Sequence, residues 1–205
     1  MGARARTIAA VAAAALIGAC GNGREEIDAG VRDRVVTLGD SAAMSLARTL
    51  SGRLNAALSE GGPAAAVEFC AGRAMELTDS VSGALGPGWS LRRTALRTRN
   101  PANAPDSLEA LAIHWFQAAE DSAAATGAEP PLTHVQRTQA GDYRYYMPVR
   151  MGHMCLQCHG DREQIEPAVR AVLDQLYPAD QATGYGQGEL RGLIRVTVPG
   201  SAIDN

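Results

Sequence analysis

The segment Cys155-Leu156-Gln157-Cys158-His159 constrains the possible fold and function of this chain more than any other feature of its sequence. Its two thiols and one imidazole fit a zinc site, a redox-active disulfide or a covalently attached haem. A structural zinc ion needs four ligands, usually from two such pairs, and the sequence contains one pair. A thioredoxin-like pair opens a helix within a βαβ unit, which the surrounding sequence does not predict.

A haem accounts for all three functional residues of the segment. Two cysteines three positions apart suit the two vinyl groups of the porphyrin, and the adjacent histidine then reaches the iron. Attachment of this kind takes place in exported chains. The sequence therefore favours one haem c, bound to Cys155 and Cys158 with His159 as an axial ligand, provided that the chain is exported.

The first twenty residues predict export. Two arginines precede an apolar run over residues 8–17, which is too short to span a bilayer and fits the core of a signal peptide. The run ends in Ile17-Gly18-Ala19-Cys20, which is typical of a bacterial lipobox. We expect cleavage before Cys20, a lipid on its thiol, and a location in the cell envelope on the periplasmic or extracytoplasmic face. An ordinary signal peptide with a chance cysteine is the alternative.

Charge and composition exclude one class of partner. All 19 basic residues are arginines, and 22 acidic residues give a formal net charge of −3. A nucleic-acid-binding surface needs a basic stripe, so we expect no nucleic acid. No second apolar run approaches the length of a membrane helix, and no internal repeat is present. The exported chain is therefore expected to form one domain.

Apolar periodicity and turn residues divide the chain into its elements. Helices are predicted over 24–60, 64–83, 107–124 and 162–176, and strands over 89–97, 132–139, 143–150 and 189–198. Gly61-Gly62 ends the first helix, and Asp106 with Glu109 forms a capping box for the third. The expected buried side of this third helix carries Leu108, Leu111, Trp115 and Ala118. Helices followed by antiparallel strands with helices between them are typical of an α+β domain.

Cys70 has no partner among the four cysteines once Cys20, Cys155 and Cys158 are assigned. It lies on an apolar stripe of the second helix, which contains Val67, Cys70, Ala74, Leu77 and Val81. This placement fits either a small buried core residue or a second axial ligand of the iron. The other candidates for that ligand are His114, His134, His153, Met147, Met151 and Met154.

Four segments resemble a known family. They are GGPAAAVEFC at 61–70, LRTRNPANAPDSLE at 96–109, YYMPVRMGHMCLQCHG at 145–160 and YPADQATGYGQGELRGLIRVTVP at 177–199. The family is the single-haem c-type domain with a PAS-like fold and His/Cys iron ligation. It occurs as a stand-alone exported protein and as the extracytoplasmic sensor region of some histidine kinases and cyclases.

The resemblance implies a fold, a ligand pair and a division of the chain. It implies a five-stranded antiparallel PAS-like sheet with long N-terminal helices beside it. It also implies that His159 is the proximal ligand and Cys70 the distal thiolate. The expected parts are a lipoprotein signal peptide (1–19), an anchor-proximal segment with the start of the first helix (20–39), the haem domain (40–199) and a tail (200–205).

A haem with two axial ligands has no open position for a substrate, so we expect no enzyme. The expected function is a low-potential redox or gas sensor, with an envelope electron carrier as the alternative. Arg97 and Arg99 are candidates for binding the haem propionates, and Tyr185 and Arg191 are weaker ones. The expected partners are a membrane and an unidentified redox or signalling protein, with a homodimer as a further option.

Overall fold

A four-stranded antiparallel sheet, in the order β1-β4-β3-β2, forms the centre of the structure, which is a computed structural model that describes residues 27–204. Its strands are β1 (Ser90–Thr94), β2 (His134–Arg137), β3 (Tyr143–Arg150) and β4 (Leu190–Val198). Its helices are α1 (Ala29–Gly72), α2 (Ala74–Gly83), α3 (Ser107–Thr126), α4 (Leu156–His159) and α5 (Pro167–Leu176). The signal peptide and Cys20 lie outside the described residues.

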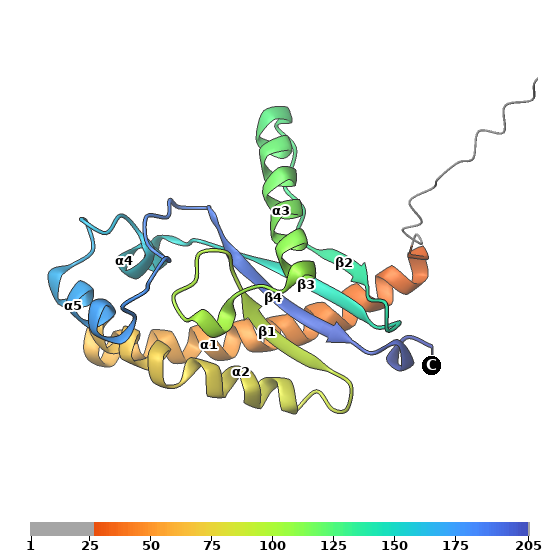
Figure 1. Cartoon of the computed structure of the whole chain (residues 1–205), viewed down its shortest axis with the longest axis horizontal. Coiled ribbons are helices and arrows are strands. Elements are labelled where there is room, and N and C mark those ends of the chain that lie inside the picture. Colours follow the sequence, from red (N-terminus) through yellow and green to blue (C-terminus); the bar gives the residue numbers. More distant parts are fainter. Residues whose placement is uncertain (1–26, 205) are drawn as a thin grey trace, which may run out of the picture.

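The α+β class is confirmed, with helices on both faces of the sheet (Figure 1). The implied count of five strands is wrong for the described part of the chain, which has four. Each of the four lies within the residue range of one predicted strand. β1 ends at Thr94 because the N–H of Ala95 donates to the carbonyl of Asn103 instead of extending the sheet.

Helix α1 runs along one face of the sheet (Figure 1) and forms the main core with it. The helix contributes Val35, Ala42, Ala43 and Leu46, and the sheet contributes Leu91, Val135, Tyr143, Tyr145, Ile194, Val196 and Val198. Gly39 is the point of closest approach, since a Cβ atom there would overlap the Cβ and Cγ atoms of Tyr145. The hydroxyl of Tyr145 donates to Asp40 at 3.0 Å, so the same ring is fixed at both ends.

The predicted break between the first two helices is present as a kink. Gly62 has φ 71° and ψ −170°, which is not helical, and Pro63 starts the next helical segment. That segment ends sooner than expected, because Arg73 leaves the helical conformation with φ −122° and α2 follows separately. Helix α5 also starts later than predicted, since Glu166 precedes Pro167 and adopts ψ 136°.

Helix α3 crosses the opposite face of the sheet and stands out from it (Figure 1). Its capping box, Asp106 with Glu109, is confirmed. The expected buried side is wrong: Leu111 is 52% exposed and Trp115 is 41% exposed. The side chains that α3 buries are Glu109, Ala112, Ile113, Phe116 and Ala123.

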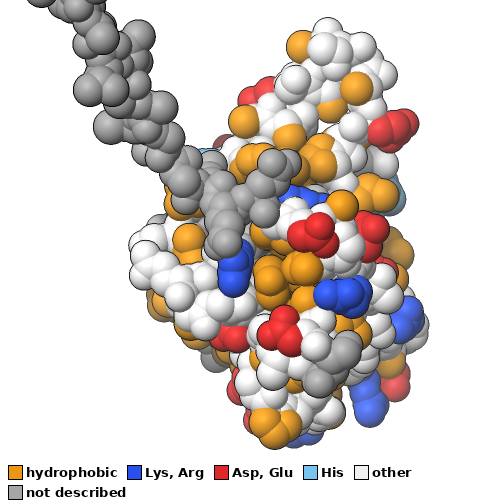
Figure 2. All heavy atoms as spheres, turned by 90° about the vertical axis from the view of Figure 1, so that its right-hand side faces the viewer, with side chains coloured by type: hydrophobic (Ala, Val, Ile, Leu, Met, Phe, Trp, Pro, Cys, Tyr) orange, Lys and Arg blue, Asp and Glu red, His pale blue; other side chains and the backbone are white. Residues whose placement is uncertain are grey.

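A buried ion pair explains this rotation of α3. Glu109 is fully buried and accepts a hydrogen bond from Nε of Arg195 on β4 at 3.1 Å. Ala112, Ile113 and Phe116 follow it at positions i+3, i+4 and i+7, so they share its face. A buried carboxylate must keep its cation, and this outweighs the burial of Leu111 and Trp115. Figure 2 shows hydrophobic side chains left exposed among charged ones on the side of the molecule that includes α3.

None of the helices within residues 27–204 has the length and apolar character needed to cross a membrane.

The contact between Gly39 and Tyr145 yields a stability prediction. Gly39→Ala should lower the free energy of unfolding by about 1–3 kcal/mol, because the added methyl group must displace a buried ring. Gly52→Ala is the matched control, since nothing lies within 4 Å of a Cβ at that helical position. The control should raise stability by up to about 1 kcal/mol. Urea denaturation measures both, and equal effects would contradict the packing argument.

Candidate functional site

The CxxCH segment forms a short turn of helix, α4, preceded by a 3₁₀ turn over His153–Cys155. Helical spacing places Cys155, Cys158 and His159 on one side of this turn. Both cysteines are free thiols; Cys155 is exposed and Cys158 is half-buried. Gly160 ends the turn, and a Cβ atom there would lie 2.6 Å from the carbonyl oxygen of Leu156. The turn therefore presents two thiols and an imidazole together, and it requires a glycine immediately after them.

His159 is held in one tautomer. Its Nδ1 lies 2.6 Å from the carbonyl oxygen of Ala182, and because a carbonyl only accepts, Nδ1 carries the proton. The lone pair of the neutral imidazole is then on Nε2, as in histidines that bind a metal through that atom. Burial, followed by the charges of Arg99 and Arg191, lowers the pKa of His159 to about 3. The imidazole is therefore neutral at physiological pH, and its Nε2 can donate an electron pair to a metal.

The loop before β4 closes over the CxxCH turn. The N–H groups of Gly184 and Tyr185 donate to the carbonyls of Gly160 and His159 at 2.6 and 2.9 Å. The ring of Tyr185 packs edge-on to His159, with 6.4 Å between the ring centroids. These contacts join the segments around residues 159 and 185, although 26 positions separate them in the sequence.

Arg99 ties the loop to the turn from a third segment. Its Nε donates to Asp180 Oδ2 at 3.0 Å, and its Nη2 donates to the carbonyl of Cys158 at 2.5 Å. The side chains of Arg99 and Asp180 are only 10% and 4% exposed. The charge of Arg99 is thus matched by a buried carboxylate, and its main contact with the site is to the backbone of Cys158.

Arg97 and Arg191 gather around Tyr185. The guanidinium of Arg97 stacks on the Tyr185 ring at 3.9 Å from its centroid, and that of Arg191 lies at 5.5 Å. Arg97 also donates to the carbonyl of Thr183 and pairs with Glu189 at 3.4 Å. Arg97, Arg99, Tyr185 and Arg191, the four residues named from the sequence as propionate candidates, therefore lie in one cluster beside His159.

Cys70 reaches the same region from α1. It is half-buried and lies close enough to Cys158 for the two thiols to interact electrostatically. Burial raises the pKa of Cys70, and the positive charges of Arg93 and Arg99 oppose that rise. Cys158 packs against the cluster that joins α1 to α5 through Val67, Ile165, Val169 and Leu173. The fold thus brings Cys70 to the CxxCH turn from an element 85 positions earlier.

The other candidates for a second axial ligand are placed less well. His114 is exposed on α3 and contacts Gln117, and His134 stacks on Trp115 at 4.2 Å. His153 and Met154 are exposed, and Met147 belongs to the core under α1. Met151 is buried beside Ala182 and Tyr185, on the loop side of the turn where His159 already lies.

The zinc alternative has no ligand set in the described part of the chain. No group of three or more His, Cys, Asp or Glu side chains within residues 27–204 is placed to hold a metal ion. The donors present are two adjacent thiols, one imidazole with a free Nε2 and one thiol from α1. This set fits a covalent porphyrin with axial ligands better than a tetrahedral ion.

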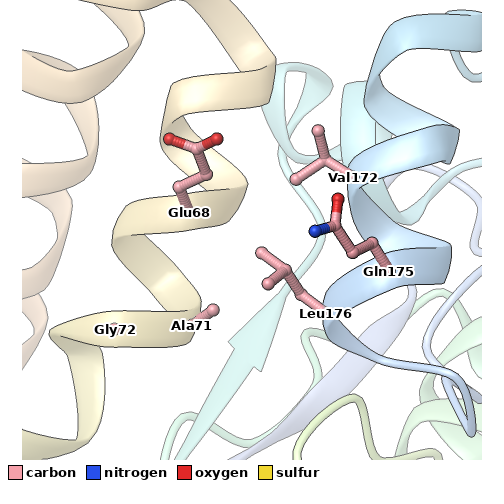
Figure 3. Close-up of a pocket in the computed structure, with 6 residues that line it drawn as sticks. All are labelled: Glu68, Ala71, Gly72, Val172, Gln175 and Leu176. Atoms are coloured by element: carbon pink, nitrogen blue, oxygen red, sulfur yellow. The ribbon is translucent and has the colours of Figure 1, made fainter.

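A cleft of about 430 Å³ lies between α1 and α5 (Figure 3). Its lining residues are Glu68, Ala71, Gly72, Val172, Gln175 and Leu176. None of these is a candidate ligand, so the cleft is adjacent to the site and separate from it.

Sequence reasoning missed three contributors to the site. The first is the carbonyl of Ala182, a backbone group whose contact with His159 no sequence pattern predicts. The other two are Tyr177 and Arg93, which both interact electrostatically with Cys70. Tyr177 lies in a predicted loop and Arg93 in a predicted strand, and neither segment was assigned a role at the site. The alternation of β1 was the available signal for Arg93, because it places that residue on the face opposite Arg92.

The sequence model of the Tll0287-like family matches residues 3–199. A solved structure described as the cyanobacterial heme-protein Tll0287 is similar to this chain, with a TM-score of 0.57 and 26% sequence identity. The match covers 84% of this chain and 96% of that one. A comparison with curated proteins found no match.

Proposed function

This chain belongs to the Tll0287-like family, and from that membership and the site geometry we propose that it carries one haem c, attached covalently to Cys155 and Cys158. The observation that carries the proposal is the α4 turn, which presents two free thiols and an imidazole whose Nδ1 is already bonded to Ala182. The similar cyanobacterial protein is a heme-protein, which supports the same cofactor here.

The proposed axial ligands are His159 and Cys70. His159 would bind through Nε2, because its other ring nitrogen donates to a carbonyl. Cys70 would bind as a thiolate, because it is the free thiol on α1 that lies near Cys158. An anionic sulfur ligand favours ferric over ferrous iron, so the expected potential is low.

Arg97 is the best-placed candidate for binding a propionate. Its side chain is 41% exposed and its ion pair with Glu189 is long, at 3.4 Å, so a propionate can replace Glu189 as its partner while the hydrogen bond to Thr183 and the stacking on Tyr185 remain. Arg99 is buried against Asp180 and the carbonyl of Cys158, and its proposed role is to hold the attachment turn in place. Of the two stronger candidates from the sequence, Arg97 and Arg99, only Arg97 is therefore proposed to bind a propionate.

The proposed role is that of a redox or gas sensor. Haem supplies an iron that changes oxidation state and binds a diatomic gas wherever a coordination position opens. Cys70 is the residue that controls that position, because an anionic ligand is held less firmly by ferrous than by ferric iron. The proposed partner is a second protein that responds to this change at the haem.

We further propose a lipid anchor at Cys20 in the cell envelope. The lipobox ends seven residues before Ile27, where the described structure begins. A link of that length reaches at most about 25 Å, which would keep the domain at the membrane surface.

Covalent attachment predicts that haem survives denaturation. The denatured protein should retain its haem on acid-acetone extraction and give a pyridine haemochrome with two thioether bonds. Cys158→Ala should leave at most one bond, detected as a shifted haemochrome band and by mass spectrometry of haem peptides. Complete extraction of haem from the wild-type protein would refute covalent attachment.

Thiolate ligation predicts a specific effect of Cys70→Ala. Ferric wild type should be low-spin with the near-infrared bands of thiolate ligation, whereas the variant should be high-spin or water-bound. The variant should also have a higher reduction potential, because the anionic donor is gone. Val67→Ala, one turn away and buried, is the control: it should cost about 2 kcal/mol of stability and leave the spectrum unchanged.

The same preparations distinguish a sensor from an electron carrier. Loss of thiolate ligation and binding of CO by the reduced wild type would support sensing. Unchanged six-coordination in both oxidation states would support electron transfer instead.

The anchor predicts the form of the mature protein. Mature chain should begin at Cys20, carry lipid and partition into detergent, whereas Cys20→Ser should release it from membranes. Mass spectrometry of the N-terminal peptide measures this, and cleavage at any other position would exclude the lipoprotein assignment.

A further inference from the structure

Arg93 projects from β1 into the layer between the sheet and the helices α1 and α2. Its neighbour Leu91 lies in the core under α1, and Arg93 pairs across the strands with Ile194, a residue of the same core. Arg92 points to the opposite face, where its Nε lies 3.7 Å from Glu109. Strand alternation therefore fixes Arg93 on the face that carries Cys70.

The guanidinium of Arg93 lacks a matching anion. Its Nε is buried without a hydrogen-bond partner, and its Nη2 donates only to the sulfur of Met75 at 3.6 Å. No carboxylate within residues 27–204 forms an ion pair with it. A buried cation without a counter-charge is costly, and thioether sulfur is a weak acceptor. Arg195, on the other face of the sheet, differs because the carboxylate of Glu109 balances its charge.

Cys70 is the acidic group whose charge acts most on this cation. Burial raises the pKa of Cys70, and the positive charge of Arg93 opposes that rise. Met75, which accepts from Arg93, lies five positions after Cys70 in the chain. Arg99 also acts on Cys70, but Asp180 already neutralises Arg99 at 3.0 Å. Tyr177 lies nearby and carries no charge at physiological pH, since burial raises its pKa. Of the two cations within residues 27–204 that lower the pKa of Cys70, Arg93 is thus the one without a carboxylate partner.

We propose that the half-buried Arg93 is the counter-charge of the Cys70 sulfur and sets how firmly that sulfur stays on the iron. This inference rests on the proposed ligation by Cys70. A ferric iron would itself balance the negative sulfur. A ferrous iron would carry one positive charge less, so the stabilising contribution of Arg93 to the bound thiolate would be larger. Arg93 therefore acts as a positioning residue that opposes release of Cys70 on reduction and thereby limits entry of a gas.

The test compares CO binding to the reduced holoprotein in charge-neutral and charge-retaining variants. Arg93→Gln and Arg93→Met remove the charge, and Met keeps an unbranched side chain if Gln disturbs the fold. After reduction with dithionite, both should bind CO about tenfold faster than wild type or more, because the ferrous thiolate has lost its counter-charge. Arg93→Lys should bind CO at close to the wild-type rate. Arg92→Gln, on the opposite face of the same strand, should do the same.

Ferric spectra separate failure of this inference from failure of the proposed ligation. A wild-type ferric spectrum without thiolate bands refutes ligation by Cys70 and overturns this inference with it. Thiolate bands in wild type with equal CO-binding rates in wild type and both neutral variants, or with no CO binding by any of them, overturn the role of Arg93 alone. Loss of the thiolate bands in both neutral variants, with the bands retained in Arg93→Lys, supports the role of Arg93 in the ferric state as well.

Discussion

The hydrogen bond between His159 Nδ1 and the carbonyl of Ala182 joins the turn that carries the two thiols to the loop that leads into β4. The loop is held there by Arg99, which contacts Asp180 on one side and the carbonyl of Cys158 on the other. Because β4 lies between β1 and β3, the CxxCH turn is connected to the centre of the sheet. A small helix such as α4 has little stability of its own, so these contacts determine where its side chains point.

The kink in α1 lets one chain segment serve the core and the site. Residues before Gly62 cover the sheet, and Gly39 allows the helix to approach Tyr145 closely. Residues after the kink turn toward α5, where Val67 packs and Cys70 comes near enough to Cys158 to influence its pKa. In a straight helix, the face that packs on the sheet would continue unchanged past residue 62. The positive φ of Gly62 breaks this continuity, so a different face of the second segment is buried.

Two guanidinium groups on opposite faces of the sheet, the buried Arg195 and the half-buried Arg93, differ in their partners. Arg195 has Glu109, and this pair fixes the rotation of α3 even though Leu111 and Trp115 remain exposed as a result. Arg93 has only Met75 and the facing thiol. The first arrangement is complete without any ligand. Under the proposed ligation, a negatively charged Cys70 sulfur would supply the missing counter-charge of the second.

The sequence by itself determined the local features of this protein. Gly61-Gly62 fixed the kink, Asp106 with Glu109 fixed the start of α3, and the spacing of Cys155, Cys158 and His159 fixed a helical turn with its donors on one side. These depend on backbone conformation and on residues a few positions apart, which a sequence pattern records. Only the tertiary structure decided which distant groups meet. The position of the Ala182 carbonyl at His159 and that of Arg93 beside Met75 arise from strand pairing and helix packing. The buried face of α3 was set by Arg195, 86 positions from Glu109.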